Sequence, residues 1–174
     1  SMGLMEFLLT ANHAVGKNIL IIFLAESNSG GVAFNSKALP DELGLRKLNL
    51  WKNSTNDGFY KCNIGQESNG GNNLVGHTGL SSNSGWHGWE LELSNEIDSG
   101  LFDENTTFLV KCGQGGSHIA EWGVSDTYYT TAISRIDNAL TTISTINNNT
   151  TDIFIMYTHG INDAIAGTNP DTWY

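Results

Sequence analysis

Three short polar segments of this chain hold the residue types that acyl transfer needs, namely Ser27, Gly116 and Asn162. A serine hydroxyl at a strand-to-helix turn can attack an ester carbonyl, and the serine's own N–H points into the same space. A glycine lets a second backbone N–H approach the developing oxyanion, and an asparagine amide can donate a further hydrogen bond to it. The three residues therefore predict a site for acyl transfer, a reaction that a serine nucleophile can perform without a metal or an organic cofactor.

Each of these residues follows an apolar run that has the length of a β-strand. The runs cover residues 19–25, 106–112 and 152–157. Apolar residues on both faces are typical of a strand buried in a parallel sheet. Because the carboxyl ends of parallel strands meet at one edge of a sheet, we expect the three loops to lie together there. The alternative interpretation of Ser27 is an ordinary turn after a core strand.

Two segments between these strands have helical periodicity. Residues 89–97 repeat apolar side chains at four-residue spacing, and Ser99 and Gly100 end the pattern. Asp126 begins a longer helix, and the stripe that we expect to face the sheet comprises Tyr129, Ile133, Ile136, Leu140 and Ile143. Strands that alternate with helices predict one α/β domain over residues 1–174, with parallel strands and right-handed crossovers.

The segment between the first strand and the first helix has no long periodic run. Residues 48–52 and 59–64 are short strand candidates separated by a polar turn, which predicts a hairpin, and Pro40 can open a short helix. Residues 65–88 form a polar, glycine-rich loop, with Trp86 and His87 as candidate substrate-binding residues. The aromatic residues of this loop, together with Trp89 directly after it, either stack on a sugar or anchor the loop to the core.

The chain is acidic, with 174 residues, a formal net charge of −10 and only eight Lys and Arg. So few cations argue against nucleic-acid binding, and no stretch has the pattern of a membrane-spanning or membrane-surface helix. Cys62 and Cys112 lack metal-ligand spacing, and the sequence leaves a disulfide between them open. Ser1 and Met2 are interpreted as an expression remnant, and residues 3–9 lack the basic flank and cleavage site of a signal peptide, so the localisation stays open.

The segments around the three candidate residues resemble those of SGNH (GDSL-like) hydrolases, especially the carbohydrate esterases that include sialate O-acetylesterases and acetyl-xylan esterases. Residues 25–28, Ala-Glu-Ser-Asn, match two of four positions of the first block, Gly-Gln-Ser-Asn. Residues 111–122 contain the double glycine and the later tryptophan of the second block. Residues 159–163, His-Gly-Ile-Asn-Asp, resemble the third block. Three such blocks in this order, each after a predicted strand, carry more weight than any one alone.

The resemblance implies the SGNH hydrolase fold, a three-layer α/β/α flavodoxin-like parallel sheet. It also implies that Ser27 is the nucleophile. The implied oxyanion hole consists of the Ser27 N–H, the Gly116 N–H and the Asn162 amide, with Gly115 as the alternative second donor. The implied substrate is a carbohydrate that carries acyl groups, most often O-acetyl, and the implied partners include neither nucleic acid nor a membrane.

The family's catalytic aspartate and histidine, which lie in a late Asp-x-x-His block, have no counterpart in this sequence. The closest string is Asp171-Thr172-Trp173-Tyr174, which ends in tyrosine. The resemblance therefore implies a domain that is C-terminally incomplete or that has lost this block. A serine hydroxyl without an adjacent base is a poor nucleophile, and loss of a triad member typically lowers the rate by ~10⁴ or more.

His159 and His118 are candidates for a substitute base, because they share loops with the proposed oxyanion groups. Their alternative roles are a hydrogen-bonding neighbour of the site for His159 and an exposed loop residue for His118. We expect Asp163 to order the loop by accepting hydrogen bonds from backbone N–H groups rather than to serve in a catalytic triad. Glu26 either orients a partner or is a surface acid.

Two further functions are open at this point. One is a carbohydrate-binding or structural protein that keeps the fold without catalysis, and the other is the N-terminal piece of a split esterase. An incomplete parallel sheet would also expose an edge or an apolar face. We therefore expect the chain either to form a homo-oligomer or to cover that surface with residues 32–75.

Overall fold

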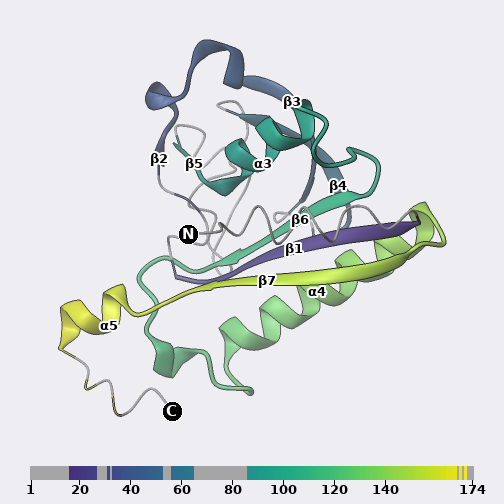
Figure 1. Cartoon of the computed structure of the whole chain (residues 1–174). Coiled ribbons are helices and arrows are strands. Elements are labelled where there is room, and N and C mark those ends of the chain that lie inside the picture. The colour runs from purple at the N-terminus through teal and green to yellow at the C-terminus, as the bar shows by residue number, and fades with distance from the viewer. Residues whose placement is uncertain are drawn as a thin grey trace.

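A five-stranded sheet in the order β4-β3-β6-β1-β7 forms the centre of the fold (Figure 1). The computed structural model describes residues 16–26, 31, 33–52, 56–64, 86–167, 169 and 171. The strands are β1 (Lys17–Ala25), β3 (Gly44–Trp51), β4 (Phe59–Ile64), β6 (Thr107–Gly113) and β7 (Thr150–Thr158). All neighbouring pairs are parallel except β3 and β4, which form the predicted antiparallel hairpin.

The first apolar run is the central strand of the three whose loops carry the candidate residues. β1 pairs in parallel with both β6 and β7, and its residues Ile19–Phe23 are at most 5% exposed. The register aligns Leu24 with Cys112 and with Tyr157, so the three strands end at the same level. Without the β3–β4 hairpin, the first, second and third strands along the chain are β1, β6 and β7. In the sheet they lie in the order second, first, third, which is the order of the first three strands of a flavodoxin-like sheet. The predicted parallel α/β architecture is therefore confirmed.

Helices cover both faces of the sheet and enclose two apolar cores. Helix α3 (Trp89–Asp98) packs Leu93 and Ile97 against one face, in a cluster with Ile21, Phe23 and Leu109. Helix α4 (Thr127–Ile146) runs along the opposite face, as Figure 1 shows, and its Ile143 packs with Leu20 and Val110. Both helices begin where the sequence predicts. A short helix, α5 (Ile161–Ala166), follows β7.

The predicted apolar stripe of α4 is partly wrong. The side chains that α4 buries are Ala132, Arg135, Ala139 and Ile143, whereas Ile133 is 40% exposed. The small alanines on the buried face let the helix lie close to the sheet. Ile133 of the predicted stripe therefore lies beside this contact, whereas Ile143 is buried in it. Arg135 is buried because its guanidinium donates a hydrogen bond to the Lys111 carbonyl at 3.0 Å.

The third apolar run is an edge strand, which corrects the prediction that both of its faces are buried. β7 pairs with β1 on one side and with no strand of the described residues on the other. Ile153, Ile155 and Tyr157 are 46%, 59% and 51% exposed, whereas Phe154 and Met156 pack against the α3 core. The run of apolar residues therefore has one covered face and one open face.

The segment before α3 forms small elements near the carboxyl edge of the sheet. Pro40–Glu42 is a short 3₁₀ helix, as expected for a helix opened by proline. β2 (Ala33–Phe34) and β5 (Trp86–His87) pair as a two-stranded antiparallel sheet. Residues 65–85 of the predicted polar loop lie outside the described residues.

Both cysteines are buried thiols in different cores. Cys62 belongs to the cluster under α3 and Cys112 to the cluster under α4, so the sheet separates them and they form no disulfide. Burial raises the pKa of the Cys112 thiol to about 12, which makes it unreactive at neutral pH. Among the described residues, every helix is too short or too polar to cross a bilayer.

Candidate active site

A cleft of about 980 Å³ opens at the carboxyl ends of β1 and β7, next to the start of α3. Its lining includes Glu26 and His159, which follow these two strands, and His87 and Trp89 from the β5–α3 corner. Ligands of open α/β sheets bind at this edge, beyond the carboxyl ends of the strands. The cleft therefore lies at the edge of the sheet where the sequence predicts that the candidate loops meet.

Asn162 links the loops that follow all three strands. Its Nδ2 donates one hydrogen bond to Glu26 Oε2 at 3.3 Å and another to the Ser117 carbonyl at 3.1 Å. The Glu26 N–H in turn donates to the Thr158 carbonyl at 3.2 Å. The structure thus brings together the ends of β1, β6 and β7, as the parallel arrangement predicts.

Asp163 is a buried carboxylate that faces two histidines. Its Oδ2 accepts a hydrogen bond from the Ile119 N–H at 3.0 Å, so its expected role in ordering a loop is confirmed. The same oxygen lies 3.3 Å from His159 Nδ1, and Oδ1 lies 3.5 Å from His118 Nδ1. The contact between His159 and Asp163 was not predicted from the sequence. Its only signal is the four-residue spacing of the two residues, which spans the start of a helix too short to show periodicity.

His159 is enclosed, but its ring nitrogens are poorly satisfied. The side chain is 2% exposed, and its ring stacks on Tyr157 at 5.9 Å and meets Trp122 edge-on at 6.5 Å. Neither ring nitrogen makes a well-aligned hydrogen bond within the described residues, even though Nδ1 lies near Asp163. Burial lowers the pKa of His159, and the nearby carboxylates of Asp163 and Glu26 oppose this effect. The imidazole is therefore neutral at neutral pH, as a general base must be.

His118 lies at the rim of the site. Its side chain is 40% exposed, and its backbone N–H donates to Glu121 Oε2 at 2.7 Å. It is not among the residues that line the cleft. Its position agrees with the interpretation as a solvent-exposed loop residue that also faces Asp163.

Gly116 is an exposed residue with φ of +73°, in the left-handed region that favours glycine. The next residue, Ser117, is buried and holds the loop in place. Its Oγ donates to the Gln114 carbonyl at 2.9 Å and accepts from Trp122 Nε1 at 3.1 Å. The double glycine and the tryptophan of the second block thus belong to one hydrogen-bonded loop.

Ser27, the predicted nucleophile, lies outside the described residues. Of the two candidate substrate-binding residues, His87 lines the cleft, and its Nδ1 lies 3.0 Å from Asn35 Oδ1. Trp86 is not among the lining residues, and its ring meets Phe34 edge-on at 6.5 Å.

Trp89 is a cleft residue for which the sequence gives two indications, a loop aromatic that could stack on a sugar and the first apolar position of a helix. It is 50% exposed and lines the cleft, while its ring stacks on Phe23 at 6.3 Å.

A buried ion pair supports the corner that carries Trp89. Lys111 Nζ lies 2.8 Å from Glu90 Oε2, and the two side chains are 1% and 0% exposed. Glu90 Oε1 also accepts the Gly88 N–H at 2.7 Å. The Glu90 carboxylate therefore connects the start of α3 to β6. The pair could not be predicted from the sequence, in which Lys111 stands within an apolar run.

The described residues contain no group of three or more His, Cys, Asp or Glu arranged to hold a metal ion. Comparison with protein-family models and with curated protein sequences gives no match for this chain.

Proposed function

We propose that this protein is a serine ester hydrolase of the SGNH fold that removes acyl groups, most often O-acetyl, from a carbohydrate. The observation that carries the proposal is the cleft at the carboxyl ends of β1 and β7. His159 lines this cleft and faces the carboxylate of Asp163. Asn162 and Gly116 are not among the lining residues, but Asn162 joins the three motif-bearing loops beside the cleft through Glu26 and Ser117. Fold, loop placement and residue types agree with the same chemistry.

In the proposed mechanism the Ser27 Oγ attacks the acyl carbonyl carbon, and its proton passes to His159 Nε2. Nε2 is the available nitrogen because Nδ1 faces Asp163. The tetrahedral oxyanion accepts hydrogen bonds from the N–H groups of Ser27 and Gly116 and from the Asn162 amide. Collapse expels the sugar oxygen, which takes the proton from His159, and a water molecule then hydrolyses the acyl-enzyme to release the free acid.

The proposal assigns the base to His159 rather than to His118. His159 lines the cleft and is buried, whereas His118 is at the rim and 40% exposed. An Asp–His couple in these loops would replace the absent Asp-x-x-His block.

Covalent labelling tests the nucleophile directly. A fluorophosphonate reacts with an activated serine, and mass spectrometry of the labelled chain should locate the adduct on Ser27. Heat-denatured protein is the control for non-specific reaction. An adduct on another serine, or equal labelling of native and denatured protein, would contradict the assignment.

A second candidate function is carbohydrate binding without catalysis. The observation that favours it is that both N–H bonds of the Asn162 amide already go to protein acceptors, Glu26 and Ser117. An oxyanion would have to displace one of them, and the longer bond to Glu26 is the one to break. Glycan binding by calorimetry, together with no labelling and no turnover during long incubation, would select this alternative.

A further inference from the structure

All eight Lys and Arg of the chain lie within the described residues, and none of them lines the cleft. Four are held by carboxylates, in the pairs Lys17–Asp152, Arg46–Asp98, Lys61–Glu104 and Lys111–Glu90. Arg135 is buried under α4, and Lys47 lines a separate hollow beside Phe102 and Asp103. Lys37 and Lys52, which complete the set, are not cleft residues. None of the eight Lys and Arg side chains is therefore placed to bind an anionic ligand in this cleft.

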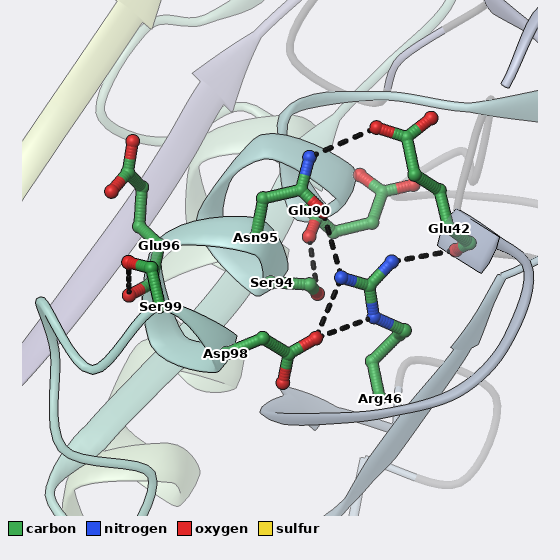
Figure 2. A network of polar contacts seen from close by, with 8 residues as sticks. All are labelled: Glu42, Arg46, Glu90, Ser94, Asn95, Glu96, Asp98 and Ser99. Carbon is green, nitrogen blue, oxygen red and sulfur yellow. Dashed lines mark hydrogen bonds and ion pairs between the residues drawn. The ribbon is translucent and has the colours of Figure 1, made fainter. Parts of the chain in front are cut away.

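Arg46 contacts two residues of the cleft wall, Glu42 and Asn95, through donors that are occupied by these bonds. As Figure 2 shows, its guanidinium is directed at Asp98 and Asn95 and at the Glu42 backbone. The contacts to Asp98 Oδ2 are 2.9 and 2.6 Å, and Nη1 donates to the Glu42 carbonyl at 2.7 Å. The guanidinium is thus neutralised by Asp98 and does not face a ligand.

Three carboxylates line the same cleft, from three different segments of the chain: Glu26, Glu42 and Glu92. Glu42 is held in its ionised form, because the Leu39 N–H at 2.7 Å and the Asn95 amide at 3.1 Å donate to its oxygens. These bonds lower the pKa of Glu42. The cleft therefore presents acceptors and negative charge.

Two independent features indicate that the cleft receives a ligand. His159 lines it with a side chain that is 2% exposed and with both ring nitrogens lacking a well-aligned hydrogen bond. Buried polar atoms without partners are rare in proteins. A hydroxyl group of a bound ligand could supply a partner for Nε2, since Nδ1 faces Asp163. Trp89 adds a half-exposed aromatic ring at the cleft, on which a sugar ring can stack.

We propose that this cleft binds a carbohydrate with free ammonium groups, a partly N-deacetylated amino-sugar chain, and rejects sugars that carry carboxylate, sulfate or phosphate. Ammonium groups would meet the carboxylates of Glu42 and Glu92, while the sugar ring stacks on Trp89. An anionic sugar would face three carboxylates and no Lys or Arg side chain. This inference deepens the proposed function by naming the substrate class, and it rests on that function only in taking the cleft as the substrate site.

Calorimetric titration of the full chain tests the inference without requiring turnover. The ligands are glucosamine, N-acetylglucosamine and galacturonic acid oligomers of equal length, at a mildly acidic pH where the amines are charged. We expect the glucosamine oligomer to bind most tightly and the galacturonic acid oligomer not to bind. The preference should weaken as the salt concentration rises.

Single substitutions assign the preference to the cleft. Glu42→Gln and Glu92→Gln should each lower the affinity for the glucosamine oligomer by about two- to fivefold and leave the N-acetylated oligomer unaffected. Glu96→Gln is the matched control, since Glu96 lies on the same helix as Glu92 but does not line the cleft. Equal effects of all three substitutions, no binding of the glucosamine oligomer, or binding of the galacturonic acid oligomer would overturn the inference.

The outcomes separate this inference from the proposed hydrolase activity. Binding of the glucosamine oligomer in a chain that has no Ser27-dependent esterase activity would refute the hydrolase and support the binding preference. Ser27-dependent hydrolysis without any preference for ammonium groups would do the reverse.

Discussion

Asp163 is the residue at which the two candidate bases meet. Its oxygens lie 3.3 Å from His159 Nδ1 and 3.5 Å from His118 Nδ1, and it is itself 1% exposed. A carboxylate in this position fixes the orientation of an imidazole and stabilises its protonated form during proton transfer. The two histidines differ in burial and in access to the cleft, and this difference can be measured.

Substitution of His159 should remove most of the esterase activity, because it removes the base. We expect His159→Gln to lower kcat for p-nitrophenyl acetate by about 10²–10⁴-fold. His118→Gln, the matched control in the same carboxylate contact, should lower it by less than about tenfold. The reverse order would assign the base to His118.

The pKa of His159 also links the site to stability. Burial lowers this pKa below the ordinary value of 6.5, so the unfolded chain binds a proton that the folded chain does not. The free energy of unfolding should therefore fall as the pH drops through 6.5 towards the folded pKa. Urea unfolding above and below 6.5 should show a larger loss for the wild type than for His159→Gln. An equal loss in both would argue against a buried neutral imidazole.

At the scale of elements, periodicity was sufficient for β1, β6, α3 and α4, which the structure contains within one or two residues of their predicted bounds. It could not show that β7 is an edge strand, because an apolar run does not report how many neighbours a strand has. It also misplaced the buried face of α4, where the alanines approach the sheet. The Lys111–Glu90 pair was not predictable, since its partners come from β6 and α3.

The buried pair makes the start of α3 sensitive to the loss of one charge. Glu90→Gln leaves Lys111 charged and without its carboxylate in the core, so the free energy of unfolding should fall by about 3–5 kcal/mol. Adding Lys111→Met to this variant removes the buried charge and should restore part of the loss. Chemical denaturation of the two variants checks this, and a change of less than about 0.5 kcal/mol in Glu90→Gln would contradict it.

At the scale of the whole molecule, the described sheet ends at β4 on one side and at β7 on the other. The β3–β4 hairpin extends it beyond β6, so within residues 32–75 the two sheet strands lie away from β7 (Figure 1). β7 has one charged residue, Asp152, which pairs with Lys17. Edge strands are normally protected by charges, proline or a covering segment.

This open edge predicts self-association through β7. Light scattering should show a concentration-dependent dimer, and Ile155→Lys should give a monomer because it places a charge in the middle of the exposed face. Leu45→Lys is the control, since Leu45 is 72% exposed in β3, on the other side of β1 and β6. A wild-type chain that stays monomeric at high concentration would refute the prediction.

The meeting of three loops at one edge of the sheet followed from the sequence, because parallel strands impose it. The carboxylate shared by two histidines did not follow from the sequence, because it depends on how α5 lies against the strand ends. For Trp89 the sequence left open whether the ring stacks on a sugar or anchors the loop, and its place in the cleft depends on how α3 lies. Contacts between short segments that are distant in the sequence produce no periodic pattern from which they could be predicted.

The central claim is that Ser27 is the nucleophile of an esterase, and the rate of p-nitrophenyl acetate hydrolysis tests it most directly. The account predicts measurable turnover by the full chain and a loss of about 10³-fold or more in Ser27→Ala, with the fold retained by circular dichroism. Equal rates for the two proteins would contradict it.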